Sequence, residues 1–499
     1  MGVIKRQGIK QSIVNYIGLA AAIVSTIFIY PLDRETYGLG QFLLGTSIFL
    51  LPFLSCGMHL VCLRYFPIFR DEDNGHNGLL GFITLVALLG WIAFAISFYF
   101  LESYFLKYLV ANEDVTLFER YLKMLVPITF FMVFSQLYYY YCSVFKRIAW
   151  PSVFQNYIKY SQPVLLLLFF YGYISLDIFV WGLVGNYVLV FGSYLLYIRS
   201  LGELHFRINF GFFTSERLKD IGQYAAYSTL LSMNHALAFR IDVFMIPIFI
   251  NFEDSGVYGI SMFMGSAIAI PLGALIQIAA PIIAEDINKG DTEHLYYLYR
   301  ESSLNLLLLG TYFFVGLVNC VGDVFLLMPN YELMLKGIDV VILVGIAKVV
   351  DMATGLNNQI INLSKHYRFG LWAVILMGAI NVFFNFTLIP RMGITGAAIA
   401  SLIAICLYNL VKLIFIYIKW KMQPFSINSL YILLLGGLIG TLIYVIPFPG
   451  GAILRVLQKG ILITALYFSA AYYFKLSIEF NQLLEGGLKM LRSLLRPRS

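Results

Sequence analysis

The chain has 499 residues, of which 60% are hydrophobic and only 12% are charged, and its formal net charge is +7. Soluble domains carry about 25% charged residues, so the composition excludes a soluble globular protein. The apolar runs are about 20 residues long, which is the length of a membrane-spanning helix and not that of the short alternating strands of a β-barrel. We therefore expect an all-α, polytopic membrane protein.

About fourteen segments are long and apolar enough to be predicted as membrane spans. Their approximate ranges are 9–30, 38–61, 78–101, 122–145, 151–173, 177–198, 221–250, 257–284, 302–322, 338–362, 369–389, 393–417, 427–446 and 451–474. No connection between them is long enough to fold as a soluble domain. The tail 475–499 alternates Leu and Met with Lys and Arg, as expected of a helix that lies on an anionic membrane surface.

The positions of lysine and arginine predict the orientation of the spans. With the N-terminus inside, about 22 of the 34 Lys and Arg fall in inner loops and termini, and about 8 fall in outer loops. Both termini are therefore expected in the cytoplasm. The positive charge follows from this topology, so a nucleic-acid partner is not expected. The five cysteines form no CxxC pair, and we expect neither a disulfide framework nor a metal site.

A short sequence pattern, Y-G-x-x-x-F followed by a proline within the next span, occurs after the first span and again after the seventh. Its residues are Tyr37, Gly38, Phe42 and Pro52 in the first copy and Tyr258, Gly259, Phe263 and Pro271 in the second. This repeat predicts two pseudo-symmetric lobes of six helices, 1–200 and 201–420, followed by a two-helix extension with an amphipathic tail, 421–499. Parallel repeats of this kind place a transport site at the lobe interface, near the middle of the membrane.

The seventh span, 221–250, carries ionisable residues near its middle. An ionised side chain there costs about 2.5–3.5 kcal/mol on insertion scales, so it needs a partner or a wet cavity. His235 and Asp242 are seven residues apart and share a helix face, whereas Arg240 points nearly the opposite way. Two interpretations stay open: a structural ion pair with another helix, or a polar cavity in which Arg240 binds an anionic cargo.

The tenth span contains a polar stripe. Lys348, Asp351, Thr354, Asn358 and Asn362 are spaced 3, 3, 4 and 4 residues apart, which places them within about a third of the circumference of an ideal helix. Lys348 and Asp351 can pair at i,i+3, but a structural pair does not require the Thr and the two Asn that extend the stripe. This pattern favours a helix that lines a cavity.

Depth in the membrane relates these two helices. Arg240 and Lys348 each lie about ten residues from the outer end of a span, and are therefore about 15 Å deep. Two cations at one depth suit a diphosphate group. Lys159, in the fifth span, is about 12 Å from the cytoplasmic end by the same rise. It either extends to the membrane surface or receives the incoming head group.

Two stretches resemble a known family. The first comprises Phe239-Arg240-Ile241-Asp242, Gly256-Val257-Tyr258-Gly259, Pro271 and Ala280-Pro281-Ile282-Ile283-Ala284, and the second comprises Asn385-Phe386-Thr387-Leu388-Ile389-Pro390 and Gly393-Ile394-Thr395-Gly396-Ala397-Ala398-Ile399-Ala400. They are similar to the seventh-to-eighth and eleventh-to-twelfth spans of the polysaccharide flippases. These proteins are the O-antigen and capsule repeat-unit translocases of the multidrug/oligosaccharidyl-lipid/polysaccharide exporter superfamily.

The resemblance implies an alternating-access transporter in a bacterial inner membrane. Its cargo would be a polyprenyl-diphosphate-linked oligosaccharide, moved from the inner to the outer leaflet for surface polysaccharide synthesis. The polysaccharide polymerase and the chain-length machinery are the partners it implies, besides membrane lipid. Related lipid flippases carry arginines within the first span. This chain departs from them, because after Lys10 it has no arginine or lysine until Arg34. The contribution of the first lobe to cargo binding is therefore left open.

Two alternatives from other classes remain. A cation-coupled multidrug exporter of the same superfamily would share the fold, and Asp242, His235 and Asp351 are the candidates for coupling to Na⁺ or H⁺. A membrane glycosyltransferase or polysaccharide polymerase is the enzyme alternative, and it rests on Asp71-Glu72-Asp73, which fits a D-x-D pattern. Three acids beside Asn and Gly more often form a solvated turn. No cofactor is expected.

Overall fold

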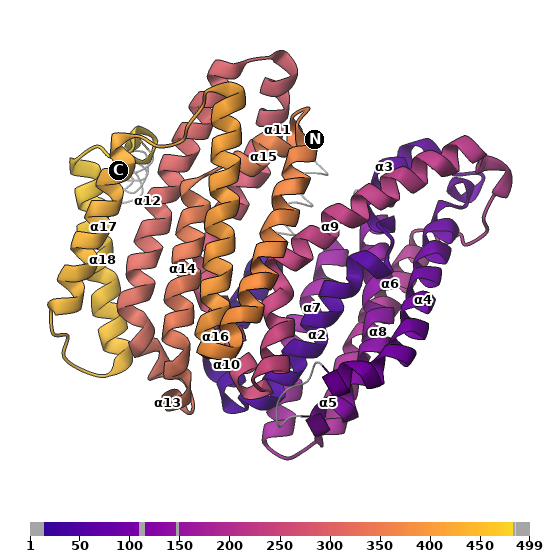
Figure 1. Ribbon diagram of the computed structural model, residues 1–499, viewed down its shortest axis with the longest axis horizontal. Helices are drawn as coiled ribbons and strands as arrows, with labels where there is room; N and C mark the ends of the chain where they lie inside the picture. Colours follow the sequence, from indigo (N-terminus) through magenta and orange to yellow (C-terminus); the bar gives the residue numbers. More distant parts are fainter. Residues whose placement is uncertain (1–13, 109–114, 146–148, 483–484, 486–499) are drawn as a thin grey trace, which may run out of the picture. The chain divides into compact units, whose positions relative to one another are not determined.

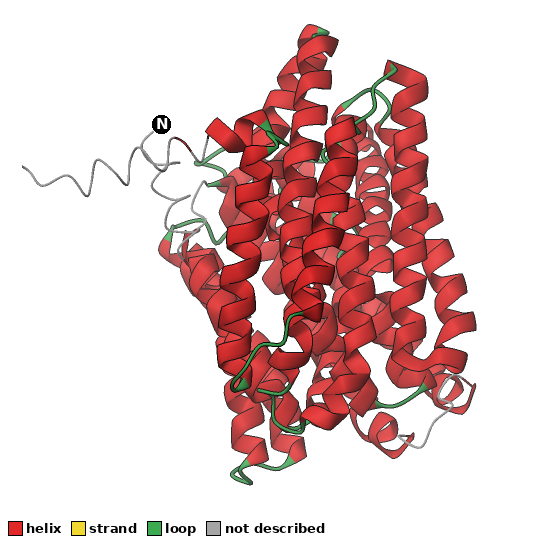
Figure 2. Ribbon diagram, turned by 90° about the vertical axis from the view of Figure 1, so that its left-hand side faces the viewer, coloured by secondary structure: helices red, strands yellow, loops and turns green. Residues whose placement is uncertain are grey.

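The computed structural model describes residues 14–108, 115–145, 149–482 and 485. Every regular element in this part of the chain is a helix, and Figure 2 shows helices joined by short loops. The expected all-α fold is therefore confirmed. The side chains of 108, 115, 149, 231, 233–240 and 277 also lie outside the described residues, although the backbone there is helical.

Nine helices in the described part of the chain are long and apolar enough to cross a membrane, judged by length and composition. The count of fourteen is not confirmed. Helix α16 (Tyr367–Trp420) has 54 residues and covers two expected spans. At 1.5 Å per residue it is about 80 Å long, whereas the hydrocarbon core is about 30 Å thick. Its backbone leaves the helical region at Gly393, with φ 61° and ψ −142°, so α16 consists of two helices joined at that glycine.

The chain divides into two compact units, Met1–Ile260 with Asn385–Ile394, and Ser261–Phe384 with Thr395–Ser499. The first unit contains the helical segment Val14–Leu32, α2 (Arg34–Leu54), α3 (Met58–Phe69), α4 (Leu79–Tyr108), α5 (Val115–Tyr121), α6 (Leu125–Val144), α7 (Ala149–Phe170), α8 (Leu176–Ser200), α9 (Ser215–Phe249) and most of α10 (Phe252–Ser266). The second contains α11 (Ile270–Lys289), α12 (Thr292–Phe325), α13 (Tyr331–Met334), α14 (Ile338–Ala353), α15 (Asn357–Leu363), most of α16, α17 (Ile427–Val445) and α18 (Ala452–Tyr473). The lobe boundaries at 200 and 420 stay a prediction.

Helix α2 is the most buried candidate span of the first unit and packs against α4, α6, α8 and α9 (Figure 1). Its first turns contact α10 backbone to backbone. A Cβ atom on Gly38 would lie 1.8 Å from the carbonyl oxygen of Phe252, and one on Gly256 would lie 2.1 Å from the carbonyl oxygen of Arg34. Only glycine permits this approach, because any side chain would overlap the opposing backbone. The two copies of the repeated pattern also meet here, since a Cβ atom on Gly259 of the second copy would lie 3.5 Å from the ring of Tyr37 of the first.

Aromatic and charged side chains surround this glycine contact. Phe42, from the first copy of the pattern, packs edge-on against Phe118 and Phe252 with ring centroids 5.1 and 5.8 Å apart. Such pairs stabilise by about 0.5–1.5 kcal/mol beyond their buried area. Arg34 Nη2 and Glu253 Oε1 form an ion pair at 2.9 Å at the same ends of the two helices. The repeat thus marks a helix–helix interface.

The second unit is built around α12. Helices α17 and α18 cover one side of it, and Tyr467, which is fully buried, donates its hydroxyl to the carbonyl oxygen of Leu308 at 3.0 Å. Gly436 on α17 faces Thr311, where a Cβ atom would approach to 2.2 Å. The two C-terminal helices are therefore packed on the unit by a continuous apolar core.

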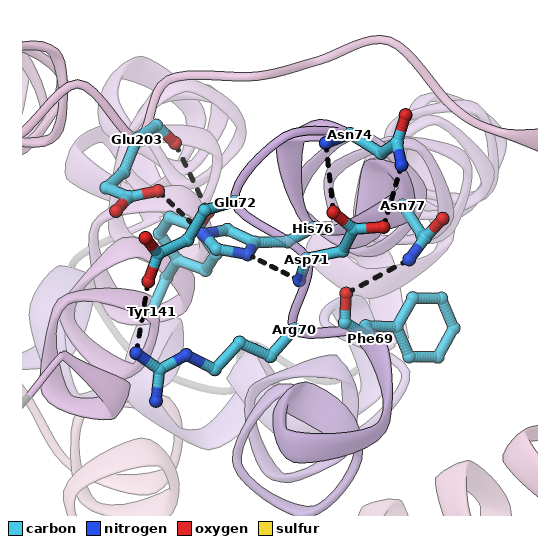
Figure 3. A network of polar contacts seen from close by, with 9 residues as sticks. All are labelled: Phe69, Arg70, Asp71, Glu72, Asn74, His76, Asn77, Tyr141 and Glu203. Carbon is cyan, nitrogen blue, oxygen red and sulfur yellow. Dashed lines mark hydrogen bonds and ion pairs between the residues drawn. The ribbon is translucent and has the colours of Figure 1, made fainter.

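The loop after α3 carries the three acids of the D-x-D pattern, and Figure 3 shows two of them, Asp71 and Glu72. Asn74 donates to Asp71 twice, from its backbone N–H at 3.2 Å and from Nδ2 at 2.8 Å, and these bonds lower the pKa of the Asp71 carboxyl. The ring of His76 accepts from the backbone N–H of Asp71 through Nδ1 and contacts Glu203 Oε2 through Nε2 at 2.6 Å. Asp71 therefore organises a turn, which is the structural interpretation of this pattern.

The glycine contact leads to a prediction about stability. Gly38→Ala should destabilise the protein by about 1–3 kcal/mol, because the new methyl group forces α2 away from α10. Gly192→Ala on α8 is the matched control, since no heavy atom lies within 4 Å of a Cβ placed there. Thermal unfolding of the detergent-solubilised protein measures both. Equal midpoints for the two variants would contradict the close contact.

Candidate functional site

The tenth predicted span is interrupted in its middle. Helix α14 ends at Ala353 and α15 begins at Asn357. Between them Gly355 has φ +59°, in the left-handed region that glycine favours. The hydroxyl of Ser303 on α12 donates to the carbonyl oxygen of Ala353 at this break. Non-helical backbone at membrane depth requires such internal partners. The expectation of one continuous helix with one polar stripe is therefore wrong at this point.

A cluster of polar side chains surrounds the break, within the second unit. It joins α14 and α15 to the second half of α16, and its members are Asp351, Thr354, Asn357, Asn358, Tyr408, Asn409 and Lys412. We call this set the polar cluster. The buried apolar side chains on either side of it, including Leu356, Ile360 and Ile416, hold α15 against α16. Apolar packing thus brings the polar groups into contact.

Asn409 is the centre of the polar cluster and is only 1% exposed. Its Oδ1 accepts from Thr354 Oγ1 at 2.9 Å and from Asn357 Nδ2 at 3.2 Å. Its Nδ2 donates to Asp351 Oδ1 at 3.2 Å and to the carbonyl oxygen of Ile405 at 3.1 Å. A side-chain amide has two donor and two acceptor positions. All four are used, so Asn409 fixes the relative positions of α14, α15 and α16.

Lys412 lies one helical turn beyond Asn409 and is also 1% exposed. Its Nζ donates to Asn357 Oδ1 at 3.0 Å and lies 3.7 Å from the centre of the Tyr408 ring. Among the described residues, no carboxylate lies within ion-pair distance of this ammonium. Asp351 is connected to it only through the amides of Asn409 and Asn357. The polar cluster therefore holds a buried cation whose direct partners are neutral.

Two of the predicted site residues belong to the polar cluster. Asp351 accepts from Asn409, and Asn358 Oδ1 accepts from the hydroxyl of Tyr408 at 3.0 Å. Lys348 is half-buried on α14, three residues before Asp351. Asn362, at the end of the predicted stripe, is exposed on α15 and faces Gly370, where a Cβ atom would lie 2.2 Å from its Oδ1. The stripe is thus divided by the break.

The remaining predicted residues belong to the first unit. Asp242 on α9 is 1% exposed, and its carboxylate accepts from the hydroxyl of Tyr258 at 2.5 Å and from Asn385 Nδ2 at 3.4 Å. These bonds connect the repeated Y-G pattern and the Asn385 stretch to one carboxylate. Lys159 lies exposed on α7. The side chains of Arg240 and His235 lie outside the described residues, so their predicted roles stay predictions.

Sequence reasoning missed Tyr408, Asn409 and Lys412. The available signal was Asn and Lys three residues apart within the apolar run 393–417, which places them on one helix face. Lys412, however, is only about 8 Å from the predicted inner end of that run. A lysine at that depth usually extends its ammonium to the membrane surface. The sequence alone does not distinguish that arrangement from burial against α15.

The whole fold is similar to that of several membrane transporters. One is the lipid II flippase MurJ in an inward closed conformation, with a TM-score of 0.75 and 14% sequence identity over 94% of this chain and 100% of that one. A second is an inward-facing multidrug resistance MATE family transporter of the MOP superfamily, with a TM-score of 0.64 and 15% identity over 82% and 94% of the two chains.

A third similar structure is a MOP superfamily transporter from Pyrococcus furiosus, with a TM-score of 0.57 and 15% identity over 84% of this chain and 95% of that one. No family model matches the sequence, and no curated protein is significantly similar to it. The chain therefore shares the fold of these solved transporters.

The break in the tenth span allows a second prediction. Gly355→Ala should destabilise the protein by about 1–2 kcal/mol, because an L-residue is strained at a left-handed φ and its Cβ would lie 3.1 Å from Ser303. Gly437→Ala on α17 is the matched control, with no heavy atom within 4 Å of the new Cβ. Thermal unfolding in detergent compares the two variants. An unchanged midpoint for Gly355→Ala would show that the break does not require glycine.

Proposed function

We propose that the chain is an alternating-access transporter that moves a polyprenyl-diphosphate-linked oligosaccharide from the inner to the outer leaflet of a bacterial inner membrane. The observation that carries this proposal is the buried ammonium of Lys412, bound to an amide oxygen and an aromatic ring. An amide oxygen is readily exchanged for a phosphate oxygen, which is the stronger, charge-assisted partner. The similarity to the MurJ fold, over the full length of that chain, supports the same class of transporter.

The strength of this interaction suits a transported group. At about 4 Å and an effective dielectric near 20, one charge–charge contact contributes about 4 kcal/mol before desolvation. That helps to offset the dehydration of a diphosphate without trapping it. The amides and hydroxyls around Lys412 are also the groups that bind sugar hydroxyls. The polar cluster therefore has the chemistry of a head-group site for an anionic glycolipid.

The helix break beside the polar cluster supports a site whose helices move during transport. Lys412 is buried, so cargo can reach it only if α15 shifts away from α16. Gly355 absorbs the necessary change of backbone angles, because it lacks a Cβ atom and already occupies a region that other residues rarely adopt. Arg240, Lys348 and Lys159 remain candidates for further contacts with the cargo, and both termini are proposed to be cytoplasmic. A polysaccharide polymerase and chain-length machinery would be the partners of such a carrier.

The second candidate function is a cation-coupled multidrug exporter. It is favoured by Asp242, a buried carboxylate held by a tyrosine hydroxyl and an asparagine amide. Carboxylate, amide and hydroxyl oxygens together suit a small hard cation such as Na⁺, and a buried carboxylate also suits a proton. The similarity to a MATE transporter is consistent with this class. Asp242, Asp351 and His235 are therefore proposed for coupling to Na⁺ or H⁺ under either function.

The cargo assignment predicts a specific loss of transport. In proteoliposomes, the purified protein should move a fluorescent polyprenyl-diphosphate oligosaccharide to the leaflet where an impermeant quencher reaches it. Lys412→Gln removes the charge and keeps a hydrogen-bond donor, on a side chain that is one bond shorter. We expect it to lower the initial rate by about tenfold or more, corresponding to at least 1.4 kcal/mol of lost interaction. Lys348→Ala and Arg240→Ala are expected to abolish transport as well.

The matched control is Lys419→Gln, an exposed lysine two turns further along α16. It should transport at the rate of the unmodified protein. Efflux of a cationic dye, measured in the same vesicles, distinguishes the two functions. The exporter function would be favoured over the flippase by two results together. The unmodified protein would not move the glycolipid, and the Lys412→Gln variant would still export the dye.

Ion coupling gives a separate prediction. Asp242→Asn preserves the hydrogen-bonding shape but removes the negative charge, so transport should lose its dependence on an imposed Na⁺ or H⁺ gradient. The gradient-driven part of the rate is expected to fall by about tenfold. Transport is measured with each gradient imposed in turn. A gradient dependence identical to that of the unmodified protein would remove Asp242 from coupling.

A further inference from the structure

A second group of charged residues lies among α12, α17 and α18 of the same unit. Asp323 is close to the end of α12, and Arg455 and Lys459 are one turn apart at the start of α18. Arg455 Nε and Lys459 Nζ each lie 2.7 Å from a different oxygen of the Asp323 carboxylate. Lys459 also donates to the carbonyl oxygen of Asn319 at 2.8 Å.

The charges of this group do not balance. One carboxylate faces two cations, and within the described part of the chain Arg455 and Lys459 form no other ion pair. The side chains are largely shielded, with exposures of 8% for Asp323, 18% for Lys459 and 31% for Arg455. A structural ion pair requires only one cation, and a partly buried charge without a counter-ion is unfavourable. The group therefore has the charge of an anion-binding site.

These residues line a cavity of about 530 Å³. Its polar wall consists of the three charged residues and Asn319, and its apolar wall includes Tyr444 and Phe448. Helices α12, α14, α17 and α18 contribute residues to its lining, and α12, α17 and α18 are candidate membrane spans. The cavity lies where α17 ends and α18 begins. The cavity is therefore at the level where phospholipid head groups meet the acyl chains.

Apolar side chains continue outward from the cavity along α17 and α18. Tyr444, Val445, Leu454 and Leu457 are exposed, with Tyr444 at 85% and Val445 at 72%. In a membrane this surface faces lipid. A ligand that matches the whole site has a phosphate for the two cations and a hydrocarbon chain for this surface. A soluble phosphate would use only the first of these features.

We propose that this cavity binds the phosphate of an anionic phospholipid, with Arg455 and Lys459 as the phosphate-binding residues and the acyl chains along α17 and α18. Asp323 positions both cations and limits their attraction for the lipid. The predicted topology places the site in the outer leaflet. The site is separate from the polar cluster and does not depend on which cargo the protein carries.

Native mass spectrometry of the full-length protein, released from mixed vesicles of phosphatidylglycerol and phosphatidylcholine, tests this assignment. The unmodified protein should retain phosphatidylglycerol above its share of the vesicle lipid. Asp323→Asn raises the net charge of the site, so we expect retention to increase, on the order of tenfold in affinity. The triple variant Asp323→Asn, Arg455→Gln, Lys459→Gln leaves a neutral site of similar shape and should lose the preference.

Lys289→Gln serves as the matched control, because this lysine is 67% exposed on α11 and its ion-pair partner among the described residues is Glu285. It should retain lipid as the unmodified protein does. A purely structural role for Asp323 predicts the opposite sign, a weaker preference in Asp323→Asn, and that result would overturn the proposal. Added inorganic phosphate is the second arm. If it removes the preference at millimolar concentration, the site takes phosphate from solution and the lipid assignment fails.

Discussion

Burial of polar groups in membrane-length helices is the constraint from which the rest of this structure follows, and the amide of Asn409 shows how it is met. In hydrocarbon there is no water to satisfy an amide, a hydroxyl or a carboxylate. Asn409 therefore uses both donors and both acceptors on groups from α14, α15 and α16. Its partners come from three helical segments, so these hydrogen bonds can form only when the three segments are packed together. The arrangement leaves Lys412 beside a neutral amide rather than a carboxylate.

In the first unit, glycine residues permit a close contact between two helices. Gly38 and Gly256 let α2 and α10 approach until each helix contacts the backbone of the other. Tyr37 and Gly259, one from each copy of the repeated pattern, also meet at this contact. Tyr258 extends this relation to Asp242, which also accepts from Asn385. Residues far apart in the sequence are joined because a buried carboxylate requires several donors.

The sequence was sufficient for the helical class, because runs of about 20 apolar residues leave few other structures possible in a membrane. It also identified Asp351 and Asn358 as polar residues of one helical face. It could not show that Gly355 divides that face, since a single glycine within an apolar run is compatible with a continuous helix. Nor could it assign Lys412, because depth along one helix does not determine what lies opposite it. Contacts between helices depend on how the helices pack, and the periodicity of one segment carries no information about its neighbours.

The shortness of α15 has a consequence for its dynamics. A helix of seven residues is far below the ~12–15 residues at which an isolated helix becomes marginally stable in water. It persists because Asn357 and Asn358 are anchored to α16 and its apolar face is covered. Loss of these anchors and melting of α15 are then one cooperative event. The rate of amide hydrogen exchange in α15 should therefore report whether the hydrogen bonds of Asn357 and Asn358 to α16 are formed. These bonds lie next to the buried Lys412.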